Sequence, residues 1–169
     1  CDGVDDCRWS GIQTTLGAHK TWTGINASDE LGGAVGGGGD LNGDGYNDVV
    51  LGAPGFDNAS TSNTGRAYIF HGSATGISAG LTSPTGAVSS TVAGDALGSA
   101  VTILPDIDAD GDDELLIGIR KSDNGTQADA GSVILVRGSI TAYVNQSSAY
   151  LTVKGARNTD YAGSNLAVV

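Results

Sequence analysis

Residues 40–48 read DLNGDGYND, and residues 106–114 read DIDADGDDE. The two acidic stretches lie 66 positions apart, and the same displacement relates four further blocks of the chain. The matched blocks pair residues 29–32 with 95–98, 50–52 with 116–118, 57–58 with 123–124, and 65–73 with 131–139. Matches in a single register indicate a structural repeat, because a fixed period of tens of residues is typical of stacked supersecondary units.

The repeat divides the chain into five segments. Two repeats cover residues 29–94 and 95–159, and residues 160–169 begin a third. Residues 12–28 contain a run similar to the last strand of a repeat, so we expect the last strand of a preceding blade there. Residues 1–11 form an acidic segment that holds both cysteines. We therefore expect the repeat pattern to be interrupted at each end of the chain.

Each repeat contains short runs rich in β-branched residues and bounded by Gly, Asn, Asp or Ser, which predict strands. These runs are residues 49–51, 67–70, 88–92, 115–117, 133–136 and 149–153. We find no amphipathic helix that could connect parallel strands, so the sheets should be antiparallel. The sequence predicts an all-β protein of four-stranded propeller blades, with about two and a half repeats forming a partial propeller or one that another chain completes.

The acidic stretches have the spacing of a loop that wraps around one cation. Oxygen-bearing side chains occupy positions 1, 3, 5 and 9, and glycine at position 6 allows a sharp turn. Calcium takes about six to eight oxygen ligands, whereas softer metals favour sulfur or imidazole. Position 12 is Leu51 or Ile117 within a predicted strand, which excludes an EF-hand. The alternative is a pair of solvated turns, but two carboxylate clusters without a cation would be repulsive.

The chain resembles the FG-GAP repeat of integrin α N-terminal regions. The matching residues are Leu31-Gly32, the loop 40–48, and Gly52-Ala53-Pro54, although the second copy of the last motif reads Gly118-Ile119-Arg120. The resemblance implies a calcium-binding β-propeller with two Ca²⁺ sites. The implied ligands are Asp40, Asn42, Asp44, the Tyr46 carbonyl and Asp48 in the first site, and Asp106, Asp108, Asp110, the Asp112 carbonyl and Glu114 in the second.

The charge balance favours cations as partners. Nineteen acidic residues and eight basic residues give a formal net charge of −11, which disfavours nucleic acid and anionic lipid. No apolar run reaches the roughly 18 to 20 residues of a transmembrane segment. No nucleophile, acid and base pair or catalytic metal motif stands out, so we expect no enzyme.

Two further classes of modification can be read from the sequence. Cys1 and Cys7 are close enough in the chain to close a small disulfide loop, with a lipidated Cys1 and two free thiols as alternatives. Glycosylation sequons begin at Asn26, Asn58, Asn124 and Asn145, although the composition of β-turns also produces such triplets.

Together these features predict a calcium-stabilised structural or adhesion module at an extracellular or cell-surface location. The acidic Cys-Asp-Gly opening resembles repeats of bacterial surface proteins and favours a bacterial secreted protein. Open blade edges would either belong to a longer protein or pair between copies in a homo-oligomer or fibre. Two alternative functions remain: the non-catalytic propeller portion of a larger secreted hydrolase, or a surface protein whose loops 55–63 and 121–129 bind a protein or carbohydrate ligand.

Overall fold

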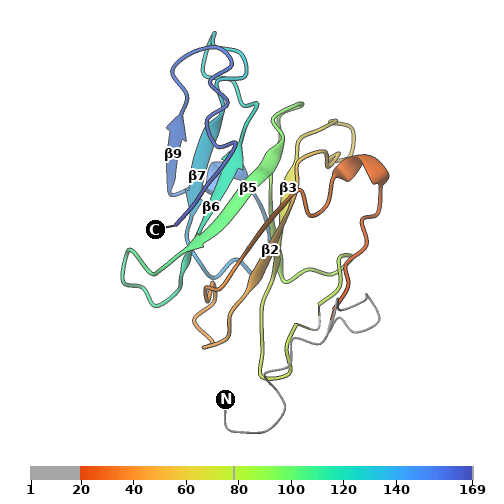
Figure 1. The fold of residues 1–169 in the computed structure, drawn as a ribbon, viewed down its shortest axis with the longest axis vertical. Coiled ribbons are helices and arrows are strands. Elements are labelled where there is room, and N and C mark those ends of the chain that lie inside the picture. Colours follow the sequence, from red (N-terminus) through yellow and green to blue (C-terminus); the bar gives the residue numbers. More distant parts are fainter. Residues whose placement is uncertain (1–19, 78, 169) are drawn as a thin grey trace, which may run out of the picture.

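The computed structural model describes residues 20–77 and 79–168, which form two stacked β-sheets (Figure 1). The antiparallel strands of the first sheet are β1 (Ala34–Gly37), β2 (Val49–Ala53), β3 (Arg66–Phe70) and β4 (Gly86–Ser89). The second sheet contains β5 (Leu97–Leu104), β6 (Glu114–Ile119), β7 (Ser132–Val136) and β9 (Leu151–Lys154), again antiparallel. The prediction of an all-β chain with four-stranded antiparallel blades is confirmed.

Helical structure in this part of the chain is limited to two short 3-10 turns, η3 (Ala27–Asp29) and η4 (Gln146–Ser148). No helix among the described residues is long and apolar enough to cross a membrane.

The first sheet has a fifth strand that the sequence did not predict. Strand β8 (Tyr143–Asn145) comes from the second repeat, yet it pairs in parallel with β4 of the first, placing Val144 opposite Val88. The segment is only three residues long and lies in the connection between β7 and β9. Its pairing covers the outer edge of the first blade, which would otherwise leave unpaired backbone groups.

The described part of the expected preceding strand is not a strand. Residues 20–24 have no regular secondary structure, and the rest of the segment up to residue 19 lies outside the described residues. Trp22 instead packs against Phe70 of β3, with ring centroids 4.8 Å apart. It joins Leu31 and Phe56 over a small core on the outer face of the first blade.

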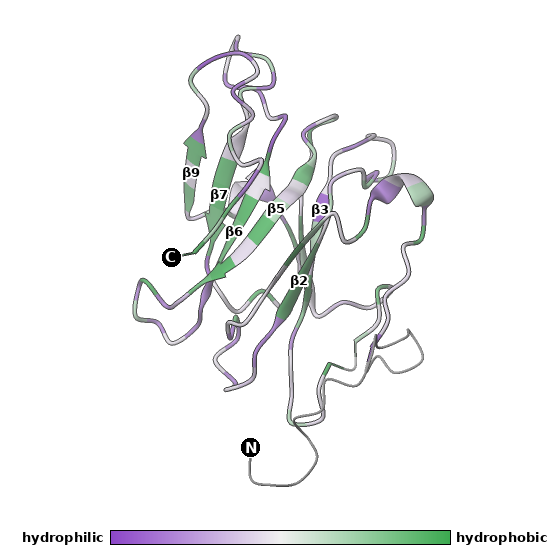
Figure 2. Cartoon of the chain, viewed as in Figure 1, coloured by the Kyte–Doolittle hydropathy of each residue, from purple (hydrophilic) through white to green (hydrophobic). Residues whose placement is uncertain are grey.

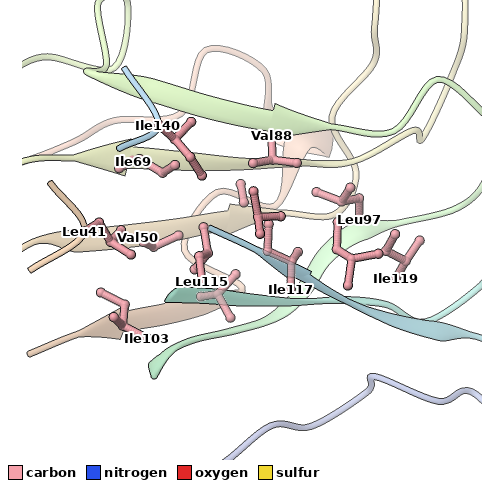
Figure 3. Close-up of a cluster of buried hydrophobic side chains, with 14 residues drawn as sticks. Leu41, Val50, Ile69, Val88, Leu97, Ile103, Leu115, Ile117, Ile119 and Ile140 are labelled. Atoms are coloured by element: carbon pink, nitrogen blue, oxygen red, sulfur yellow. The ribbon is translucent and has the colours of Figure 1, made fainter. Parts of the chain in front are cut away.

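The main hydrophobic core lies between the two blades (Figure 3). Alternate residues of the strands point to the same face of a sheet, so each blade presents one apolar row to the other. Val50, Ile69 and Val88 come from the first blade and have no exposed surface. Leu115 and Ile117 of β6 face them from the second. Hydrophobic residues follow the strands, and hydrophilic residues gather in the loops at the strand ends (Figure 2).

Candidate metal centre

The second acidic loop connects β5 to β6 and gathers four of its predicted side-chain ligands. Ligand atoms of Asp106, Asp108, Asp110 and Glu114 all lie within 4.8 Å of one another. The backbone wraps because Asp106 accepts hydrogen bonds from the amides of Ala109 at 2.7 Å and Gly111 at 3.0 Å. Gly111 has φ +101°, a conformation that glycine adopts without strain. The loop therefore converges on a small volume lined by carboxylate oxygens.

Glu114 is the deepest residue of this cluster. It opens β6 and is 1% exposed. Its Oε2 accepts a hydrogen bond from the Ile107 amide at 2.8 Å, whereas Oε1 is buried without a hydrogen-bond partner. Burial raises the pKa of Glu114, and the charges of Asp108, Asp106 and Asp110 raise it further, against the lowering effect of the Ile107 amide. A buried oxygen in this state is costly unless another group satisfies it.

Asp108, at the edge of the cluster, likewise has one carboxylate oxygen with a partner and one without. Its Oδ1 is also buried without a hydrogen-bond partner, and its Oδ2 pairs with Arg137 Nε at 2.8 Å. Two unsatisfied oxygens in one group of four carboxylates suit a hard divalent cation, because calcium coordinates oxygen ligands and needs several of them. The side chains present in the second loop therefore fit the ion that its spacing predicts.

The first acidic loop connects β1 to β2 and is organised by hydrogen bonds. The Asp40 carboxylate accepts the amides of Asp44 at 3.1 Å and Gly45 at 2.6 Å. Asp44 in turn accepts Asn42 Nδ2 at 3.1 Å and the Tyr46 amide at 2.9 Å. Within the described ranges, this loop does not gather three acidic side chains as the second loop does.

Asp48 explains the difference between the loops. Its carboxylate is fully buried and accepts the Leu41 and Gly72 amides, each at 2.7 Å. Burial raises the pKa of Asp48, and these two hydrogen bonds act in the opposite direction. Each carboxylate oxygen has more than one acceptor site, so the bonds leave room for a cation but already satisfy both oxygens. Without an ion, the buried carboxylate of the first loop is thus better satisfied by hydrogen bonds than that of the second.

Residues 31–70, which include the first acidic loop and strands β1 to β3, match the family model of the FG-GAP repeat. This chain is an FG-GAP repeat protein. The integrin alpha pat-2 proteins of Caenorhabditis briggsae and Caenorhabditis elegans are each 31% identical to it, in an alignment of 134 residues that covers 75% of the chain. The chain spans 10% of the length of these curated relatives. The predicted resemblance is confirmed, and the two sheets are blades of a partial propeller.

Two residues at the candidate site of this FG-GAP repeat protein were not predicted from the sequence. Arg137 aligns with His71 in the repeat and pairs with Asp108. Asp113 aligns with Asn47 and contacts both acidic loops through backbone amides. For both residues, the signal that could have been found in the sequence was a charged residue in the second repeat where the first repeat has an uncharged one.

The remaining predicted sites of the FG-GAP repeat protein are dispersed. Asn26 and Asn145 are exposed, and Asn58 and Asn124 are half-buried. Nδ2 of Asn124, where a glycan would be attached, donates a hydrogen bond to the Gly155 carbonyl at 2.9 Å.

Cys1 and Cys7 lie outside the described residues. The carbonyl ligands predicted at Tyr46 and Asp112 stay predictions; the Asp112 side chain accepts a hydrogen bond from Ser139 Oγ.

Proposed function

We propose that this FG-GAP repeat protein is a non-catalytic, calcium-stabilised structural or adhesion module that works outside the cell or at its surface. The observation that carries the calcium assignment is Glu114 Oε1, a buried carboxylate oxygen without a hydrogen-bond partner inside a group of four acidic side chains. Similarity to two proteins named integrin alpha supports the adhesion role and the location.

Calcium would stabilise the fold through the connection between loop and core. Leu41, the second residue of the first acidic loop, is fully buried and belongs to the core cluster between the blades, together with Leu115 and Ile103. Ordering that loop therefore also orders the packing of the two sheets. The formal net charge of −11 adds to the effect, because bound cations reduce the repulsion among carboxylates.

Thermal unfolding with calcium and with chelator tests the proposal. A ligand that binds only the folded state at 100 times its dissociation constant adds about 2.7 kcal/mol of stability per site. We expect a marked calcium-dependent rise of the midpoint for the wild-type chain. Glu114→Gln should raise the midpoint in chelator, because a buried unpaired charge is removed, and should reduce the calcium-dependent rise.

The matched control is Glu30→Gln. Glu30 is exposed, at the start of the first repeat and outside both acidic loops. This variant should keep the full calcium-dependent rise. A wild-type midpoint that does not respond to calcium would contradict the proposal, as would an unchanged calcium response in Glu114→Gln.

A second function, assembly between copies, is favoured by the open face of the second blade. Ala67 and Val88 are paired neighbours on the first blade and are fully buried against the second. Their counterparts Val133 and Val153 are also paired, but Val153 is 57% exposed. Leu151 beside them is 53% exposed. We propose that a blade of a second copy covers this face, giving a homo-oligomer or fibre.

Sedimentation at saturating calcium tests the assembly. We expect wild-type species larger than a monomer and a monomeric Val153→Lys variant. Val35→Lys is the control, since Val35 is 64% exposed on β1 of the other blade, and it should assemble as the wild type does. A monodisperse wild-type monomer would contradict assembly and leave the calcium proposal standing.

A further inference from the structure

Asp113 joins the two acidic loops through both of its carboxylate oxygens. Oδ2 accepts a hydrogen bond from the Asp40 amide at 2.8 Å, at the first position of the first loop. Oδ1 accepts one from the Asp106 amide at 2.9 Å, at the first position of the second loop. The Asp113 amide donates back to the Asp40 carbonyl at 2.8 Å. Asp113 is not one of the four gathered carboxylates, and both of its oxygens accept hydrogen bonds from backbone amides.

The backbone around this junction is closely packed. A Cβ atom on Gly39 would lie 2.6 Å from Asp113 Oδ2. One on Gly138 would lie 2.7 Å from the Leu41 carbonyl oxygen and 2.8 Å from that of Asp113. Ser139, next to Gly138, donates its amide to the Leu41 carbonyl and its hydroxyl to Asp112. These contacts leave the two loops little freedom to move independently.

We propose that Asp113 is a positioning residue that couples the two loops, so that calcium binds to them with positive cooperativity. The inference rests on the proposed calcium binding. An ion in one loop fixes the backbone at its first position, and the Asp113 carboxylate transmits that order to the first position of the other. The second ion then loses less conformational entropy on binding, which is a coupling free energy between sites.

The charge of Asp113 acts in the same direction. Two bound dications repel each other, and a carboxylate between the loops that is not itself a ligand reduces this repulsion. The corresponding residue of the first loop is Asn47, which carries no charge. The link therefore depends on a residue that only the second repeat carries, and the spacing of the acidic loops does not by itself provide it.

Calcium titration calorimetry of the complete chain tests the coupling. Wild-type protein should take up two calcium ions, with the second affinity raised about fivefold or more by the first, at the lower end of usual couplings. Asp113→Asn should still bind two ions, but independently, since the amide cannot accept both backbone hydrogen bonds. Asp129→Asn removes one charge at the far end of the second blade and should keep the wild-type cooperativity.

A loop-inactivating variant gives a second readout that does not depend on the folding of Asp113→Asn. Asp110→Asn weakens the second site, so first-loop affinity should fall about fivefold or more when Asp113 is present. The same change in the Asp113→Asn background should leave first-loop affinity unchanged. Independent binding of two ions by the wild type, or coupling that survives in Asp113→Asn, would overturn the inference while sparing the proposed function. No calcium uptake by the wild type would overturn both.

Discussion

Gly52 of β2 lies directly against Gly98 of β5, so that a Cβ atom on Gly52 would be 2.1 Å from the Gly98 carbonyl oxygen. The contact recurs one repeat later, where a Cβ on Gly118 would be 1.9 Å from the Gly163 carbonyl oxygen. Glycine at these positions lets the backbones of neighbouring units approach each other closely. Around Gly163 the start of the third repeat therefore meets the second blade as the second repeat meets the first around Gly98.

Gly52→Ala should separate the two blades. The obstructing atom is backbone, so the strands must shift, and overpacking of this kind costs about 1 to 3 kcal/mol. Urea denaturation should show this loss of unfolding free energy. Gly80→Ala is the control, because no atom lies within 4 Å of the added Cβ, and its stability should be close to that of the wild type. Equal stability of both variants would show that the blade contact tolerates a side chain.

Leu41 and Ile107 occupy the same position of the two acidic loops but have opposite environments. Leu41 is fully buried between the blades, and Ile107 is 58% exposed. Leu41→Ala should cost about 2 to 5 kcal/mol of unfolding free energy, as a buried large-to-small change does. Ile107→Ala should stay within about 0.5 kcal/mol. Chemical denaturation in chelator compares them, and equal losses would contradict the anchoring of the first loop in the core.

The repeat register explains how much of the fold could be predicted from sequence. One displacement of 66 positions aligned strands β2 and β3 with β6 and β7, because equivalent residues occupy equivalent places in stacked units. The acidic loops could be placed between strands for the same reason. The gathering of Asp106, Asp108, Asp110 and Glu114 follows from local loop geometry, which the spacing already specifies.

Features that depend on contacts between repeats could not be predicted in this way. Strand β8 has three residues and pairs outside its own repeat, so neither its length nor its periodicity distinguishes it from a loop. Asp113 acts through amides on two loops, and no spacing rule connects a carboxylate with a backbone 73 residues away. The packing of Trp22 on Phe70 replaces the strand expected there, since an aromatic ring can cover a sheet without pairing with it.

Asp95 should make the fold more stable as the solution is acidified from neutral pH. Asp95 is 5% exposed, and its carboxylate accepts a hydrogen bond from Ser90 Oγ at 2.5 Å. Burial raises its pKa and outweighs the lowering effect of Ser90, so the folded state binds the proton more tightly than the unfolded chain. Stability from this group therefore grows as pH falls through the folded pKa and is lost as pH rises through it.

Urea denaturation in chelator from pH 7 down to about pH 4, near the ordinary pKa of an aspartate carboxyl, measures this effect for the wild type and Asp95→Asn. The asparagine oxygen can still accept the Ser90 hydroxyl, but the side chain no longer titrates. We expect the difference in unfolding free energy between the two proteins to change with pH, in favour of the wild type at the lower pH. Asp129→Asn is the charge-matched control. A difference between wild type and Asp95→Asn that is constant across this range would contradict a raised pKa at Asp95.

Arg137 should compete with calcium for Asp108. Its Nε pairs with Asp108 at 2.8 Å, and its guanidinium lies 4.2 Å from the centroid of the Tyr150 ring. The arginine side chain is 52% exposed, so Arg137→Gln should lower the stability in chelator by less than about 1 kcal/mol. Removing the positive charge should tighten calcium binding about two- to fivefold, measured by calorimetry, whereas Arg137→Lys should bind as the wild type does. Weaker binding by Arg137→Gln would instead mean that Arg137 holds Asp108 in the position that a cation requires.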